Sequence, residues 1–228
     1  VDYAHQLGLH LFQNGQEFDA VPHLERAARD DERFDAMWLL ATHYYRRAAW
    51  VKGLPHLERY VGLRPEHTRA LALLGTYYLK LGRHEASVRT LDRFLESDPQ
   101  NLPARINRAN ALFRSGGLDE AGDAYEELVA KHEDRPRLHY NLAAVRIKQG
   151  RCAEALDHLD RFIASGASAG TALYFKGDCL VKLERYDEAR TTFEGMLETS
   201  RANPWVYHGL SRIAWQEGRV EDALRHAR

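Results

Sequence analysis

The sequence feature that most constrains this chain is a repeat of residue types every 33 or 34 positions. One small residue recurs on these steps at Gly8, Ala41, Gly75, Ala109, Ala143, Gly177 and Ser211. A second small residue follows each of them, at Ala20, Gly53, Ser87, Ala121, Ala155, Ala189 and Ala223. Small residues at fixed positions let two backbones approach closely, so the repeat indicates a tandem array of one supersecondary unit.

Each unit has the pattern of two amphipathic helices. In the third unit, Leu71, Leu74 and Tyr78 fall at helical spacing, Gly82 interrupts the pattern, and helical spacing resumes until Pro99. The interrupting position holds Gly15, Gly82, Gly116, Gly150 and Gly218, with Ala48 and Glu184 as the two departures. A glycine there supplies the left-handed conformation that ends a helix at low cost, so we expect a turn between the helices of every unit.

Two prolines, Pro22 and Pro55, lie one repeat apart within the pattern of second helices. Proline lacks the N–H group that the interior of a helix needs, and it is tolerated in the first turn. We therefore expect these two helices to begin near Asp19 and Lys52.

The order of residue types resembles that of the tetratricopeptide repeat. The third unit carries it at Leu74, Gly75, Tyr78, Gly82, His84, Ser87, Leu91, Phe94 and Pro99. The resemblance implies an all-α, right-handed superhelical solenoid of antiparallel helix pairs, forming a single domain over residues 1–228. Its seven expected repeats, the last incomplete, are residues 1–33, 34–67, 68–101, 102–135, 136–169, 170–203 and 204–228.

The composition excludes several classes of protein. The chain has 33 acidic and 32 basic residues and a net charge of −1, whereas a nucleic-acid binder normally carries a clear basic excess. No apolar run approaches the ~18 residues that a membrane span needs. The chain begins at Val1 and its last helix pattern is short, so we expect a piece of a longer protein. Its bases are mostly arginine, which suggests a bacterial gene rich in G and C.

Cysteine and histidine give no pattern that is typical of a metal site. Cys152 and Cys179 lie in neighbouring units, where either a disulfide or two buried free thiols are open, and free thiols are the commoner state. His23, His56 and His158 recur at one position of three separate units, without a companion ligand at metal-binding spacing. We expect neither a bound metal nor another cofactor.

Catalytic patterns are also missing from the sequence. It contains no nucleophile paired with a base, no glycine-rich phosphate loop and no paired carboxylates at an expected pocket. A recurrent acid followed by arginine marks an outer helical face, where we expect ordinary solvated charge: Glu25, Glu58, Asp92 and Asp160. The chain is therefore expected not to be an enzyme.

The resemblance also implies a place for a ligand, because the first helices of this family line a concave face. Helical geometry puts large aromatic residues and amides on that face, at Trp38, Tyr45, Asn107, Asn110, Tyr140, Asn141 and Tyr174. Aromatic rings can anchor the side chains of a peptide, and amides can bond its backbone. The alternative is that some of these rings pack between helices. A clamp for a terminal carboxylate is disfavoured, because Ile106, Thr171 and Phe175 stand where it needs bases.

Five cations recur at one position near the end of the first helix, at Arg46, Lys80, Arg114, Lys148 and Lys182. Helices that stack at ordinary distances of ~10 Å would place them in a stripe along the groove. Such a stripe favours an acidic or phosphorylated partner segment. The alternative is solvated charge that suits the helix dipole.

From the sequence we therefore expect a non-catalytic scaffold or adaptor that binds a protein or peptide segment in its groove. Two other functions stay open. The chain could be a regulatory or targeting module of a larger enzyme, such as a transferase, or a structural array that assembles with itself through its exposed ends. A monomer or weak self-association is expected, with no nucleic acid bound.

Overall fold

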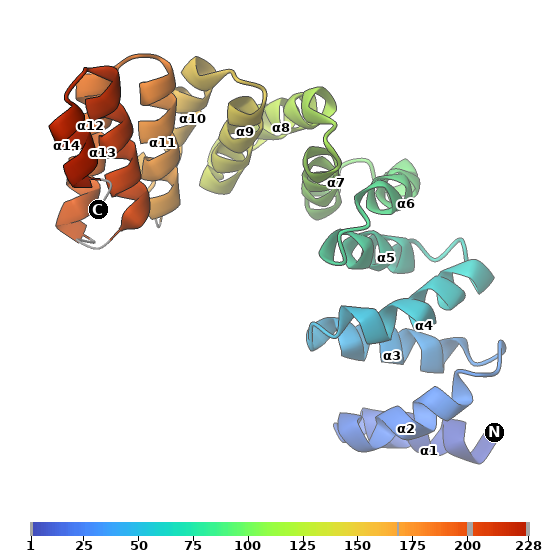
Figure 1. Ribbon diagram of the computed structural model, residues 1–228. Coiled ribbons are helices and arrows are strands. Elements are labelled where there is room, and N and C mark those ends of the chain that lie inside the picture. Colours follow the sequence, from blue (N-terminus) through green and yellow to red (C-terminus); the bar gives the residue numbers. More distant parts are fainter. Residues whose placement is uncertain (1, 168, 200–202, 227–228) are drawn as a thin grey trace. The chain divides into compact units, whose positions relative to one another are not determined.

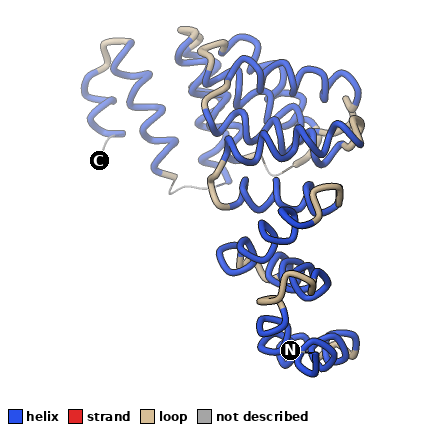
Figure 2. Tube along the Cα trace, turned by 90° about the vertical axis from the view of Figure 1, so that its right-hand side faces the viewer, coloured by secondary structure: helices blue, strands red, loops and turns tan. Residues whose placement is uncertain are grey.

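The computed structural model describes residues 2–167, 169–199 and 203–226, and these residues form helices joined by short turns, without a strand (Figures 1 and 2). The helices are α1 (Asp2–Gln13), α2 (Glu17–Ala27), α3 (Phe34–Arg46), α4 (Trp50–Leu63), α5 (Thr68–Lys80), α6 (His84–Ser97), α7 (Leu102–Ser115), α8 (Leu118–Lys131), α9 (Pro136–Lys148), α10 (Cys152–Ala164), α11 (Gly170–Lys182), α12 (Tyr186–Thr199), α13 (Pro204–Gln216) and α14 (Val220–His226). We call the odd-numbered ones first helices and the even-numbered ones second helices. Among the described residues, none of these helices has the length and apolar character to cross a membrane.

The helices belong to two compact units, Val1–Gly116 and Gly117–Arg228. Unit 1 contains α1–α7 and unit 2 contains α8–α14. Within each unit, every helix packs against the next one along the chain. The predicted all-α fold, a solenoid built from helix pairs, is confirmed, whereas a single domain over residues 1–228 stays a prediction.

The recurrent small residues lie where helices meet, as their spacing predicts. A Cβ atom on Gly75 would be 2.6 Å from Leu91, on the partner helix of the same repeat. Gly177 faces the ring of Phe193, and a Cβ atom there would lie 2.5 Å from it; Gly209, which is not one of the recurrent small residues, lies equally close to that ring. Contacts this short leave no room for a methyl group, so these positions fix how closely the helices approach.

The turns between the two helices of a repeat have the left-handed backbone that the glycine pattern predicts. Gly82 has φ of +74°, and the two departures adopt the same conformation, Ala48 at 53° and Glu184 at 60°. The turn geometry is therefore kept even where the sequence supplies a residue with a side chain. That conformation costs an L-residue about 1–2 kcal/mol.

The predicted starts of two second helices are wrong. α2 begins at Glu17 and α4 at Trp50, so Pro22 and Pro55 lie inside these helices. Each proline removes the hydrogen bond to the carbonyl four residues earlier. Those earlier residues, Phe18 and Val51, are 69% and 75% exposed, so water can reach this side of each helix.

Both cysteines are buried free thiols in unit 2. They belong to one apolar core cluster, together with Ala155, Leu159 and Val206. Burial raises the pKa of the Cys179 thiol well above its usual value, with a further contribution from Cys152. Of the two states left open by the sequence, the structure has the free thiols.

Candidate functional site

Some first helices of neighbouring repeats approach one another within each unit. In unit 1, α1 contacts α3 and α5 contacts α7, and in unit 2, α11 contacts α13. Side chains on each of these pairs of helices can therefore share a surface. The candidate site consists of the side chains on the first-helix surface of each unit.

The predicted aromatic residues of unit 1 are half-buried and pack between helices. The ring of Trp38 lies 5.5 Å from Tyr60 and 5.1 Å from His67. Tyr45 lies 5.1 Å from Trp50 and 5.9 Å from Tyr77. Much of each ring is thus committed to interhelical packing, which is the alternative left open by the sequence.

Unit 2 places its predicted aromatic residues in a row of rings. Tyr140 on α9 lies 6.3 Å from Phe175 on α11, and Tyr174 is 6.1 Å from Phe175. Tyr174 also meets the edge of Trp205 on α13, at 5.8 Å. Trp205 is 65% exposed, so the row ends in an open aromatic surface.

A cavity of about 340 Å³ opens at this end of the row. Its walls are carbon-rich and come from α11, α12 and the start of α13, with Gly170, Thr171, Tyr174, Phe175, Met196 and Trp205 among them. The volume lies near the lower end of the ~300–1,000 Å³ typical of ligand pockets.

The predicted amides already have contacts within the protein. The side-chain N–H group of Asn107 donates to Thr76 Oγ1 at 3.2 Å, and that of Asn141 donates to the hydroxyl of Tyr125 at 3.3 Å. Asn110 is half-buried in the same helix as Asn107 and also has a contact in the structure. A peptide backbone would therefore have to share or replace these hydrogen bonds.

The five predicted cations differ in what surrounds them. Lys80, Arg114 and Lys148 are exposed, and the described residues give them no acidic partner. Arg46 donates to Glu17 Oε1 at 2.6 Å, and Lys182 lies 2.9 Å from Asp178. Three of the five charges are therefore directly available to a ligand.

Charge is segregated between the two kinds of helix in unit 2. Asp178 is the one acidic residue in the sequences of α9, α11 and α13. Arg212 and Lys182 neutralise it at 2.5 and 2.9 Å, and they hold its pKa below the usual range despite burial. The second helices are acidic, and α8 alone carries Asp119, Glu120, Asp123, Glu126 and Glu127 against Lys131. The first helices of unit 2 therefore carry an excess of bases, and two of these bases, Arg137 and Lys148, are exposed.

The recurrent acids of the second helices are exposed or partly exposed, as expected, but they also make bonds that the expectation of ordinary solvated charge did not include. Each one bonds a neighbouring first helix, in the pairs Tyr44–Glu25 at 2.7 Å, Tyr78–Glu58 at 2.9 Å, Arg108–Asp92 and Lys176–Asp160 at 2.6 Å. Burial and the Glu25 carboxylate raise the pKa of Tyr44 to about 12, and burial with Glu58 does the same for Tyr78. These carboxylates link helices.

A buried cation in unit 2 was missed by the sequence analysis. Arg146 is only 2% exposed, and its guanidinium donates to Glu126 and to Gln149 Oε1 at 2.7 Å. Glu154 lies 3.4 Å from its Nε atom. Other repeats have Tyr78 or Leu112 at the same position, and that break in the pattern was the available signal.

A histidine pair in the same unit was also missed. His139 Nδ1 lies 3.1 Å from His158 Nδ1, and His139 Nε2 lies 3.2 Å from the carbonyl of Glu133. Burial, and then His139, lower the pKa of His158. The described residues contain no group of three or more His, Cys, Asp or Glu that could hold a metal ion. His139 is thus a partner of His158 that the sequence had not indicated.

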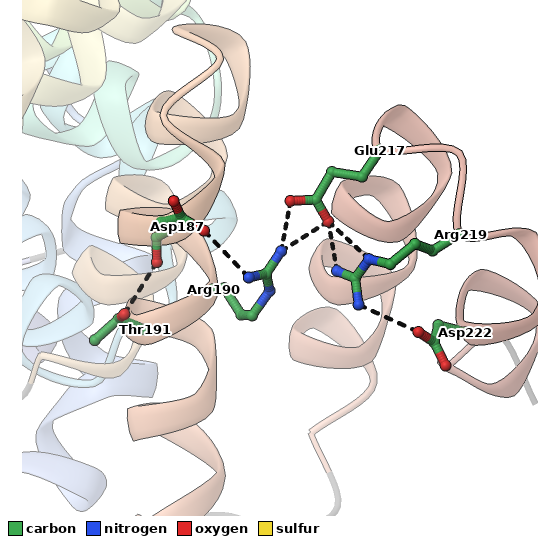
Figure 3. A network of polar contacts seen from close by, with 6 residues as sticks. All are labelled: Asp187, Arg190, Thr191, Glu217, Arg219 and Asp222. Carbon is green, nitrogen blue, oxygen red and sulfur yellow. Dashed lines mark hydrogen bonds and ion pairs between the residues drawn. The ribbon is translucent and has the colours of Figure 1, made fainter.

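A polar network joins the last two repeats of unit 2 (Figure 3). Arg190 on α12 donates to both oxygens of Glu217 at 2.6 and 2.7 Å, and Glu217 also accepts from Arg219. These hydrogen bonds, chiefly that of Arg219, lower the pKa of Glu217. Arg219 reaches Asp222 at 3.2 Å as well, so the network ties α12 to the turn between α13 and α14.

A family model described as tetratricopeptide repeat matches residues 5–68, 52–101, 72–137, 106–147 and 140–204, and a second model of that description matches residues 204–228. The chain belongs to the tetratricopeptide repeat family. Such repeats indicate a module for protein–protein interaction.

Solved tetratricopeptide repeat structures share this fold. MamA from Desulfovibrio magneticus RS-1 superposes with a TM-score of 0.68 at 16% identity, over 75% of this chain and 96% of that one. The pilF protein of Pseudomonas aeruginosa gives a TM-score of 0.64 at 19% identity, over 86% and 89%. At these identities the likeness establishes the fold alone.

Curated relatives with these repeats are longer than this chain. DnaJ homolog subfamily C member 3 of Gallus gallus is 22% identical over 240 residues, which span 98% of this chain and 41% of that protein. The chain therefore matches about two fifths of that relative.

Proposed function

We propose that this tetratricopeptide repeat chain binds an acidic segment of a partner protein along its first-helix surfaces and catalyses no reaction itself. The observation that carries the proposal is the charge segregation, with bases on the first helices and acids on the second helices of unit 2. A protein partner agrees better with the net charge of −1 than a nucleic acid does.

Exposed cations supply long-range attraction, and rings supply contact area. Lys80 and Arg114 in unit 1 and Lys148 in unit 2 have no acidic partner among the described residues, so an incoming carboxylate meets them without displacing another acid. Aromatic and basic residues are the types enriched at binding hot spots. An affinity near ~1 μM, about −8 kcal/mol, is expected for one such segment.

The test compares two triple charge reversals in capture of a purified partner or a labelled acidic peptide. Lys80→Glu, Arg114→Glu and Lys148→Glu together alter α5, α7 and α9. The matched control alters the exposed bases Lys52, Arg93 and Lys131 of α4, α6 and α8, with the same change of charge.

The first triple variant should lose binding by about tenfold or more, while the control binds as the unaltered chain does. Added salt should weaken the unaltered complex. Equal loss in the two variants, or binding that does not respond to salt, would overturn the proposal.

A further inference from the structure

The open cavity in unit 2 has a preformed apolar lining. Tyr174 is held between the rings of Phe193, at 6.2 Å, and Trp205, at 5.8 Å. The side chain of Asn203 accepts a hydrogen bond from the backbone N–H of Trp205 at 3.1 Å, which fixes the start of α13. The walls are thus positioned by core packing and by a helix cap before any ligand arrives.

Exposure of Trp205 sets this cavity apart from ordinary core packing. Its side chain is 65% exposed although it lines an apolar hollow, and a partner can still cover that surface. Trp215, on the same helix, is 63% exposed but is not part of the cavity. An exposed ring beside a hollow marks a place where an added apolar group gains contact.

The described residues that line the cavity include no charged side chain, so the charge of its ligand follows from the first helices that supply its walls. Asp178 is the one acid within the sequences of α9, α11 and α13, and Arg212 and Lys182 neutralise it. Arg137 and Lys148 on α9 add exposed positive charge on the same kind of surface. Acidic residues on either side of an apolar anchor would complement these bases.

We propose that this cavity anchors one bulky apolar side chain, aromatic or leucine-sized, of the acidic partner segment. The inference rests on the function proposed above and adds the anchor residue to it. The side chain enters the hollow beside the Tyr174 and Trp205 rings and packs against Phe175 and Met196, while the acidic neighbours of the anchor meet the bases of the first helices.

The cavity is tested first with a small probe. Para-cresol, which carries the ring of a tyrosine side chain, is titrated while the indole N–H signals of the four tryptophans are followed by NMR. The Trp205 signal should shift in a saturable way, whereas those of Trp50 and Trp215 should stay in place. Gly170→Leu should abolish the shift, because a Cβ atom on Gly170 meets nothing within 4 Å and the longer side chain can fill the hollow. An unmoved Trp205 signal would overturn the inference.

Three labelled peptides then test the anchor. One has acidic flanks and a central phenylalanine, the second has acidic flanks and a central serine, and the third has basic flanks and a central phenylalanine. The first should bind about tenfold or more tighter than the second. Trp205→Ala should bring the two within about twofold, and Trp215→Ala should keep the difference.

The outcomes separate this inference from the proposed function. Equal binding of the phenylalanine and serine peptides, both tighter than the basic one, would overturn the anchor and leave the acidic-segment function standing. A Trp205 shift with para-cresol but no preference for acidic flanks would overturn that function and the charged part of the inference. Self-association that Trp205→Ala removes would assign the cavity to a second copy of the chain and overturn the inference.

Discussion

The hydroxyl group of Tyr77 donates a hydrogen bond of 2.6 Å to the backbone carbonyl of Ala41, one repeat earlier in the chain. Gly53 makes this possible, because a Cβ atom there would lie 2.1 Å from the same hydroxyl oxygen. Burial raises the pKa of Tyr77 far above its usual value, so the hydroxyl stays protonated and can act as the hydrogen-bond donor. A small residue predicted from spacing alone thus secures a contact between neighbouring repeats.

Gly53→Ala should therefore destabilise unit 1. The added methyl group must displace the Tyr77 ring or move α4, and such overpacking costs about 1–3 kcal/mol. Denaturant unfolding followed by circular dichroism measures the change. Gly62→Ala in the same helix is the control, since its Cβ atom would meet nothing within 4 Å, and it should leave stability unchanged or raise it by ~1 kcal/mol. Equal stability of the two variants would contradict this account of the packing.

Replacing Ala48 or Glu184 with glycine should make the protein more stable. Both residues have positive φ, at 53° and 60°, so Ala48→Gly and Glu184→Gly should each raise the free energy of unfolding by about 1 kcal/mol. The reverse change Gly82→Ala should lower it by a similar amount. Thermal melts of the three variants test this, and a loss of stability in both glycine variants would refute it.

Replacing the buried cation Arg146 with an apolar residue should cost unit 2 little stability, whereas removing its acidic partner Glu126 should destabilise the unit. Arg146→Leu, which copies the residue type of Leu112, should change the free energy of unfolding by less than about 1 kcal/mol. Glu126→Ala should cost ~1–3 kcal/mol, because it leaves the guanidinium buried with fewer acceptors. Urea unfolding of both variants decides between these outcomes. A larger loss for Arg146→Leu than for Glu126→Ala would show that the ion pair is itself stabilising.

The histidine pair should make unit 2 less stable in mild acid. The folded pKa of His158 lies below that of an unfolded histidine, ~6.5, so the unfolded chain takes up the proton first as the pH falls. The stability that His158 contributes is present above ~6.5 and is lost toward its lower folded pKa. In urea unfolding at pH values of about 8 and 5.5, His158→Gln should reduce the difference in stability. The exposed His208→Gln should not, and an unchanged difference in both variants would refute the prediction.

The sequence predicts the backbone of the fold better than its polar contacts. The steps of 33 and 34 residues place Gly75 against Leu91 and Gly177 against Phe193, because close helix contact leaves only one size of residue possible. The helix starts predicted from the prolines were wrong. Pro22 lies inside a helix, where the hydrogen bond that it cannot make falls on the exposed side, near Phe18.

The side-chain partners could not be predicted because they depend on three helices at once. Arg146 bonds Glu126 on α8 and Glu154 on α10, and neither spacing stands out in the sequence. Asp92 has the pattern of a solvated acid until Arg108 is placed beside it. In the candidate site, the binding role of the recurrent cations stays a prediction, whereas the cavity beside Trp205 depends on where α12 and α13 meet α11.

Hydrogen exchange of the chain alone and in complex with a purified acidic partner tests the central claim most directly. The claim predicts slower exchange at the first-helix surfaces on binding, above all in α9, α11 and the start of α13, with α8 and α10 unchanged. Protection confined to the second helices, or equal protection of both kinds of helix, would contradict it.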